Sequence, residues 1–362
     1  NGRVTLRVDP VTGAIAELRR RGHEENLVDA SGGEGLNDYL FLPGDRLSDL
    51  KRNGTPRVVV TDAGPLVAGL RIESEAPGCR GGGLVREVRV VAGVDRIELV
   101  NTVDKERAAT PTKPNDWQHA QKGGKEGVHF AFPFRIPGGQ LRLDLPIGVI
   151  RPEYDLMPSA CKNWFTVGRW ADVSNADSGV TWVTADAPLV EVGGLTATLV
   201  GSQSDPDVWR KTVEPTQRIY SWVMNNHWGT NYRAYQEGPV VCRFVLRPHG
   251  AWSPEDGARL AIGIGQPLLV LPAGRSGLAS QPRMVVEPED VLVAGLKPSD
   301  DGRAWIVRLY GASGADRKAR VKWSNPAPAR LYRSDTGETA LEPVASSIDV
   351  PGGGILSLRA EW

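Results

Sequence analysis

The stretch Pro65-Leu-Val-Ala-Gly-Leu-Arg-Ile-Glu73 alternates in character along the chain. In an extended chain, successive side chains point to opposite faces, so the even-numbered residues from Leu66 to Ile72 share one face, opposite Arg71 and Glu73. Arg96-Ile-Glu-Leu-Val-Asn-Thr-Val103 and Leu141-Arg-Leu-Asp-Leu145 repeat this period of two. The pattern is typical of antiparallel strands with one buried face.

Turn-forming residues separate these stretches. Glycine and proline occur 42 and 27 times, in segments such as Pro10-Val-Thr-Gly13, Asn53-Gly54, Pro137-Gly-Gly139 and Pro351-Gly-Gly-Gly354. Such punctuation leaves little room for long helices, and only Leu36 to Leu50 is expected to hold a short helical turn. Many short strands separated by turns predict an all-β fold built from sandwiches.

A composition change divides the chain near residue 272. Leu271-Pro-Ala-Gly-Arg-Ser-Gly-Leu-Ala-Ser-Gln-Pro282 interrupts the alternation, which then resumes. We therefore expect a large domain over residues 1–272 and a small β-sandwich over residues 284–362, with Ala304–Tyr310 as a central strand. The alternative is a single domain in which this stretch is one long loop.

The charge balance argues against polyanionic partners. Lysine plus arginine and aspartate plus glutamate each total 43 in 362 residues, so the formal net charge is zero. We expect no nucleic-acid partner and, without a long apolar run, no membrane partner. The three cysteines and five histidines are scattered without metal-ligand spacing, so no cofactor or metal is expected in this chain. The composition does not indicate a cellular compartment.

The segment from Tyr220 to Pro239 combines amide and aromatic side chains. Amides match vicinal hydroxyl groups and aromatic rings offer flat faces, so the segment suits a pyranoside. The predicted sugar ligands here are Asn225, Asn226, Trp228, Asn231 and Tyr232, with Trp222 and Tyr235 as further rings. The alternative is a strand end followed by an asparagine-rich turn whose rings lie in the core.

The same segment resembles a loop, NN-x-W-x-TN followed by EGP, of bacterial glycoside hydrolase family 38, the α-mannosidase family. Further blocks resemble the family in the same order: Val8-Asp-Pro-Val-Thr-Gly-Ala-Ile15, Ala63-Gly-Pro65, Ile72-Glu-Ser-Glu-Ala-Pro-Gly-Cys79, Arg96-Ile-Glu-Leu-Val-Asn-Thr-Val-Asp-Lys105, Lys125-Glu-Gly-Val-His-Phe-Ala-Phe-Pro-Phe134 and Asn163-Trp-Phe-Thr-Val-Gly-Arg-Trp-Ala-Asp-Val-Ser174. The resemblance spans most of the chain up to about Gly250. It implies a large galactose-mutarotase-like supersandwich followed by a small C-terminal β-sandwich.

The resemblance also implies that catalysis belongs to a different domain. Family members carry their catalytic carboxylates and zinc ligands on an N-terminal α/β-barrel domain, and this sequence contains no counterpart of that domain. The chain starts at Asn1 and enters a strand-like pattern at Arg3. We therefore expect an excised fragment or a processed product, with zinc in the absent domain.

Three further residues are predicted to contact substrate. Family members place a tyrosine of the β-region near the bound sugar, and Tyr154 is the corresponding candidate. Arg169 and Trp170 suit a sugar as well, because an arginine bridges two hydroxyls and a tryptophan stacks on the ring. The alternatives are structural roles. Tyr154 would then cover the sandwich edge, and Arg169 and Trp170 would form a cation–π pair or belong to the core.

Two further groups of residues contain side chains of the types used in acid–base catalysis. Glu153 and Asp155 are the nearest approach to a loop carboxylate pair, but a solvated turn accounts for them without catalysis, and no catalytic residue is predicted. In Gly127–Phe134 the alternation places Val128, Phe130 and Phe132 in the core and His129 on the opposite face, as a structural residue.

Three hypotheses follow. The first is the non-catalytic C-terminal portion of a family 38-like retaining α-mannosidase, which completes a cleft for an α-mannoside together with the absent catalytic domain. The second is a stand-alone carbohydrate-binding module that uses Asn225 to Tyr235. The third is an aldose mutarotase-like epimerase, for which His129 with Glu126 or Glu153 is the available set.

Overall fold

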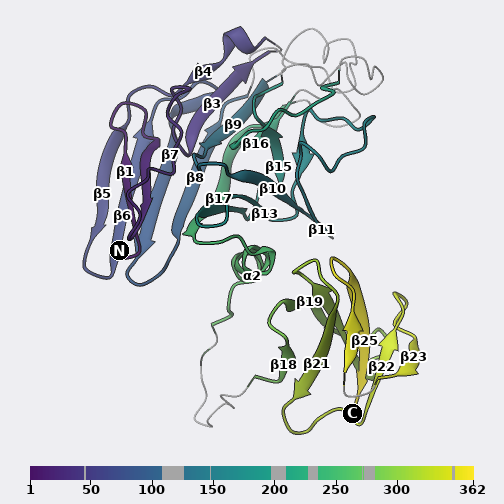
Figure 1. Ribbon diagram of the computed structural model, residues 1–362. Helices are drawn as coiled ribbons and strands as arrows, with labels where there is room; N and C mark the ends of the chain where they lie inside the picture. Colours follow the sequence, from purple (N-terminus) through teal and green to yellow (C-terminus); the bar gives the residue numbers. More distant parts are fainter. Residues whose placement is uncertain are drawn as a thin grey trace. The chain divides into compact units, whose positions relative to one another are not determined.

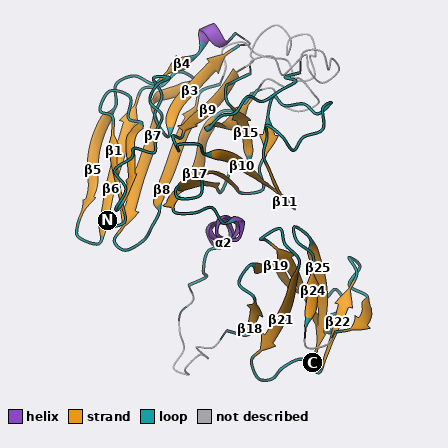
Figure 2. Cartoon of the chain, viewed as in Figure 1, coloured by secondary structure: helices purple, strands orange, loops and turns teal. Residues whose placement is uncertain are grey.

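The computed structural model describes residues 1–44, 46–107, 126–146, 148–196, 209–226, 235–270, 272, 282–344 and 347–362. Residues 1–143 and 150–252 form one compact unit, and residues 144–149 and 253–362 form another. Strands dominate both units in the described part of the chain (Figure 2). The all-β prediction is confirmed.

The first unit is a sandwich of two antiparallel sheets (Figure 1). Within the described residues, the large sheet has the order β11 (Gly148–Ile150), β10 (Gln140–Leu145), β13 (Trp170–Ser174), β14 (Gly179–Thr184), β17 (Gly238–His249), β8 (Ile97–Lys105), β7 (Cys79–Val91), β6 (Val67–Ser74) and β5 (Arg57–Ala63). Parts of its edge strands β10 and β11 belong to residues 144–149, which are grouped with the second unit. The small sheet has the order β12 (Phe165–Thr166), β15 (Leu189–Val192), β16 (Arg218–Asn225), β9 (Glu126–Pro133), β3 (Asp38–Pro43) and β4 (Lys51–Arg52).

The core of this unit lies between the two sheets. Phe130 and Phe132 of β9 face the large sheet, where Trp182 of β14 and Phe244 of β17 meet them. Phe132 lies 5.3 Å from Phe244 and 5.5 Å from Trp182 between ring centroids. The predicted core positions Val128, Phe130 and Phe132 are therefore confirmed.

A short hairpin covers one end of the large sheet. It consists of β1 (Val4–Val8) and β2 (Ile15–Arg20), and its inward residues Val4 and Leu18 are buried. The predicted strand around residues 65–73 is β6, but Leu66 precedes it and is 72% exposed. Of the other residues predicted to share the buried face, Ala68 is exposed, Leu70 is half-buried and Ile72 is buried, so the pattern holds only toward the end of the strand.

The second unit is a smaller sandwich. Its described strands form one sheet of β18 (Met284–Glu287), β21 (Arg317–Trp323) and β24 (Ile348–Val350), and another of β19 (Val291–Pro298), β20 (Ala304–Gly311), β25 (Ile355–Glu361), β22 (Arg330–Ser334) and β23 (Ala340–Pro343). The core is formed by residues such as Val307, Leu309 and Leu358. The strand expected over Ala304–Tyr310 is β20, which lies inside its sheet.

Helical structure departs from the prediction. A 3-10 turn, η1 (Leu47–Asp49), lies within the expected stretch, but the helix α2 (Pro254–Gly265) was not predicted. Ser253 caps α2 by accepting a hydrogen bond from the Asp256 amide at 3.2 Å, and Pro254 occupies the first turn. Ala258 of α2 packs with Leu292 and Ala312 of the same unit.

Candidate functional site

The predicted sugar-binding segment starts at the end of β16. Asn225 is the last residue of that strand and lies opposite Gly127 in the ladder with β9. The Asn226 amide then donates to the carbonyl of Glu126 at 2.9 Å. Trp228, Asn231 and Tyr232 lie outside the described residues. The described part thus fixes where this segment leaves the small sheet, beside the start of β9.

A buried ion pair holds this exit point. The Lys105 ammonium lies 3.0 Å from Glu126 Oε2, and the two side chains are only 1% and 5% exposed. Asn226 Nδ2 donates to Glu126 Oε1 at 2.9 Å. We name Lys105, Glu126 and Asn226 the clamp. Lys105 and Glu126 could not be paired from the sequence, because no local pattern links residues that lie on different strands.

Aromatic groups surround the clamp. The Lys105 ammonium lies 5.7 Å from the centroid of the Phe41 ring, and the Tyr39 hydroxyl donates to the carbonyl of Pro77 at 2.6 Å. Beyond the strand ends, the Arg107 guanidinium lies 3.8 Å from the centroid of Tyr235. Charged and aromatic side chains therefore gather where β8 and β16 end and where β9 and β17 begin, which is the composition expected near a sugar.

The outer face of the small sheet carries a second polar group. His129 Nε2 lies 2.9 Å from Glu191 Oε2, but the pair is not in hydrogen-bond geometry, and both side chains are buried. Trp222 stacks on the imidazole with ring centroids 5.2 Å apart. Thr196 holds the other carboxylate oxygen through its amide at 2.7 Å and its hydroxyl at 2.6 Å. The predicted placement of His129 away from the core is confirmed.

Arg169 and Trp170 lie at the start of β13. Trp170 is buried and pairs with Val183 of β14, and the carbonyl of Arg169 accepts a hydrogen bond from the Thr184 amide at 2.9 Å. Thr184 pairs with Phe244 of β17, which runs antiparallel from Gly238 beside Lys105. Phe244 is six residues along β17 from Gly238, so these two residues lie about 20 Å from the clamp, and the side chain of Trp170 is buried.

Tyr154 lies toward the opposite end. Its neighbour Glu153 accepts hydrogen bonds from Gln140 Nε2 at 3.2 Å and from the Thr216 amide at 3.4 Å. Thr216 precedes β16, whereas Asn225 ends it, and an eight-residue strand spans roughly 23 Å. Tyr154 itself is 60% exposed, with Arg151 over its ring. The structure thus separates Tyr154 from Asn225 and Asn226 within this chain.

The loop carboxylates beside Tyr154 have structural partners. Asp155 accepts hydrogen bonds from Arg151 through Nε at 3.0 Å and Nη2 at 2.8 Å, and these bonds hold the pKa of Asp155 below its ordinary value. Burial raises the pKa of Glu153. Arg151 thus contacts both oxygens of Asp155, which is the arrangement of a structural ion pair.

A buried carboxylate lies beside the small sheet at the start of β3. Asp38 pairs with Arg52 at 3.2 Å, yet burial raises its pKa from 3.8 to about 6, against the opposing charges of Arg52 and Arg86. Arg86 is buried too, and it donates to the carbonyls of Asn37 at 3.0 Å and Thr12 at 2.7 Å. Desolvation lowers the pKa of Arg86 to about 10.

Asp38 is expected to make stability depend on pH between about 4 and 6. In that window the unfolded chain ionises this carboxyl while the folded chain keeps it protonated, so the free energy of unfolding falls as pH rises. The loss amounts to about 3 kcal/mol. Asp38→Asn should remove this fall, as measured by urea unfolding of both proteins at pH 4, 5, 6 and 7.

Asp186→Asn is the control of opposite sign. Hydrogen bonds from Arg243 lower the pKa of Asp186, so its contribution is present above the unfolded pKa and is lost as pH falls. Parallel pH profiles for the wild type and Asp38→Asn would contradict the assignment of Asp38.

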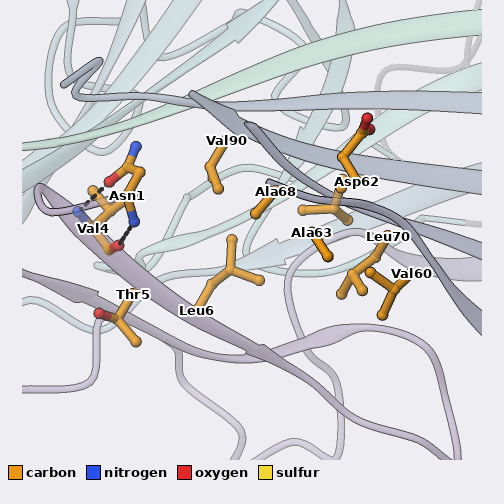
Figure 3. Close-up of a pocket in the computed structure, with 12 residues that line it drawn as sticks. Asn1, Val4, Thr5, Leu6, Val60, Asp62, Ala63, Ala68, Leu70 and Val90 are labelled. Atoms are coloured by element: carbon orange, nitrogen blue, oxygen red, sulfur yellow. Dashed lines mark hydrogen bonds between the residues drawn. The ribbon is translucent and has the colours of Figure 1, made fainter. Parts of the chain in front are cut away.

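Two pockets in the first unit have linings that differ from the predicted sugar-binding residues. A pocket of about 410 Å³ lies between β1 and the strands β5, β6 and β7, and Figure 3 shows its mainly aliphatic lining, which includes Leu6, Val60, Leu70 and Val90. A hollow of about 610 Å³ near the start of β16 is lined by residues including Asp29, Arg135, Gln217 and Arg218. The described residues that line the two pockets include none from the 220–239 segment.

The described residues offer no site for a metal ion or a membrane span. No group of three or more His, Cys, Asp or Glu side chains among them could hold a metal. No helix in that part has the length and apolar character needed to cross a bilayer.

Comparison with protein-family models gives two matches. Residues 1–193 match the model described as the glycosyl hydrolases family 38 C-terminal domain. Residues 290–356 match the model described as the glycosyl hydrolases family 38 C-terminal beta sandwich domain. No curated protein is significantly similar in sequence to this chain.

Solved structures agree with these matches in fold. An alpha-mannosidase from Enterococcus faecalis V583 aligns with all of this chain at a TM-score of 0.70 and 11% identity. A protein in the glycosyl hydrolase family 38 from Enterococcus faecalis aligns with all of it at a TM-score of 0.71 and 12% identity. The chain spans 42% and 43% of the length of these two proteins.

Proposed function

Because this chain belongs to the C-terminal domain family of glycosyl hydrolases family 38, we propose that it is the non-catalytic C-terminal portion of a retaining α-mannosidase. In this proposal it completes a sugar cleft together with an N-terminal catalytic domain. The substrate is an α-mannoside, and the zinc ion and the catalytic carboxylates belong to that other domain.

The clamp is the observation that carries the proposal. It places Asn225 and Asn226 at a defined edge of the small sheet, through bonds of 2.9 Å from both the backbone and the side chain of Asn226. A sugar site needs its polar groups fixed before the substrate arrives, because ordering them on binding costs affinity. We propose that Asn225, Asn226, Trp228, Asn231 and Tyr232 form one wall of the cleft.

Arg169 and Trp170 lie about 20 Å from the clamp along β17, so in the proposal they are not part of this wall, and their contact with the sugar needs the proposed catalytic domain. Tyr154 lies toward the other end, so its contact with the sugar depends on the proposed catalytic domain. The difference in length supports a larger protein, because the two solved proteins compared above are each more than twice as long as this chain.

The two alternative functions differ in what the structure offers them. A stand-alone carbohydrate-binding module would use the same wall without a catalytic domain. An epimerase needs a histidine and a carboxylate on opposite sides of the sugar. In the predicted set, His129 lies against Glu191 at 2.9 Å, Glu126 is bound by Lys105 and Asn226, and Glu153 accepts hydrogen bonds from Gln140 and Thr216. The geometry therefore favours the first two hypotheses.

Substitutions in the longer protein test the proposal. Trp228→Ala and Asn231→Ala should each lower kcat/KM for a chromogenic α-mannoside by about tenfold or more, because each removes a sugar contact. Val241→Ala is a matched surface control on β17, where Val241 is half-exposed. Unchanged kinetics for both loop variants would remove this segment from the cleft. Tight binding of mannosides by the isolated chain would favour the binding-module alternative.

A further inference from the structure

The clamp uses both oxygens of one carboxylate. Glu126 Oε2 pairs with the Lys105 ammonium at 3.0 Å, and Glu126 Oε1 accepts from Asn226 Nδ2 at 2.9 Å. The Glu126 carbonyl also accepts from the Asn226 amide at 2.9 Å. Asn226 is therefore bound to Glu126 at two points, one of them through a charged group.

The clamp also joins the two sheets. Lys105 is the last residue of β8 in the large sheet, opposite Gly238 of β17. Glu126 is the first residue of β9, and Asn226 follows β16, both in the small sheet. Since all three side chains are buried, water competes weakly with their interactions, which are stronger than at a surface. A substitution of Glu126 is thus expected to affect the packing of both sheets at this edge.

We infer that Glu126 is a positioning residue for the sugar-binding wall: through Asn226 it fixes the point from which the residues after β16 leave the small sheet. It acts on substrate binding through Asn226 and makes no contact with the sugar. The inference rests on the proposed function for its effect on kinetics, but its structural half can be tested in this chain alone.

Hydrogen–deuterium exchange of this chain tests the structural half. Glu126→Ala and Asn226→Ala should each raise exchange in the peptide that covers residues 218–226 by about tenfold, because each breaks the side-chain bond. The double variant Lys105→Met with Glu126→Gln should restore slow exchange. It keeps an oxygen for Asn226 and removes the ammonium that would otherwise stay buried without its partner.

Asp172→Asn is the control for general destabilisation. Asp172 is another buried carboxylate, bound by Thr181 Oγ1 at 2.7 Å and His249 Nε2 at 2.8 Å. Thr181 pairs with Arg247, nine residues along β17 from Gly238, and so lies about 30 Å from the clamp. This variant should leave exchange in residues 218–226 unchanged even if the whole chain becomes less stable.

The kinetic half is tested in the longer protein. Glu126→Ala should raise KM for the α-mannoside by about tenfold with a smaller change in kcat, whereas the double variant and Asp172→Asn should keep the wild-type KM. Raised exchange with an unchanged KM, while Trp228→Ala does raise KM, would overturn the inference and leave the proposed function standing. Unchanged exchange in both Glu126→Ala and Asn226→Ala would overturn it outright. Raised exchange with no kinetic effect of Trp228→Ala would instead count against the proposed function.

Discussion

Trp182→Ala is expected to lower the free energy of unfolding by about 3–5 kcal/mol. Trp182 is 0% exposed, and it connects the two sheets: its ring stacks on Phe244 with centroids 5.6 Å apart and contacts Phe132 of the small sheet at 5.5 Å. Alanine would leave a cavity that this close-packed aromatic cluster cannot fill by small shifts. Urea unfolding followed by circular dichroism measures the loss.

Trp182→Phe is the matched control for this prediction. Phenylalanine keeps an aromatic ring in the cluster, and Trp182 Nε1 has no hydrogen-bond partner to lose among the described residues. The phenylalanine variant should therefore lose clearly less free energy of unfolding than the alanine variant. A loss below about 1 kcal/mol for Trp182→Ala would mean that the two sheets do not depend on this cluster.

The local pattern of the sequence predicts the strands well because the period of two is itself a local property. The alternation in 127–134 separates Phe130 and Phe132, which are buried in the core, from His129 on the other face. The same reasoning failed at Leu66, which is apolar but lies in the turn before β6. Apolar character alone does not show where a strand begins.

The missed helix has a different cause. In α2 the buried positions are the small residues Gly257, Ala258 and Ala261, so its apolar periodicity is weak. The signal that was present is the start, Ser253 followed by Pro254, with Glu255 and Asp256 in the first turn. A capping signal with small buried residues is easily overlooked in a chain rich in turns.

The site was harder to predict than the fold because its contacts are long-range. Asn226 and Glu126 are 100 positions apart, and Glu191 meets His129 only because β16 lies between β15 and β9. Composition and resemblance indicated Asn226 as a candidate sugar ligand, and that role stays a prediction. The sequence could not identify the carboxylate partner of Asn226, since strand order is not visible in a local pattern.

The second large effect concerns catalysis by this chain alone. A retaining glycosidase needs two carboxyl groups roughly 5 Å apart, one of them a free nucleophile. Here Glu126 is held by Lys105, Asp155 by Arg151, and Glu191 lies against His129. We therefore expect hydrolysis to be lost entirely when the chain is separated from its proposed catalytic domain.

The decisive measurement is release of a chromogenic leaving group from an α-mannoside, in the presence of zinc, by equal molar amounts of this chain and of the longer protein. We predict turnover by the longer protein and none above the buffer rate by this chain. Turnover by this chain alone that is abolished by Glu153→Gln or Asp155→Asn would contradict the account, because it would place the catalytic site within these β-sandwiches.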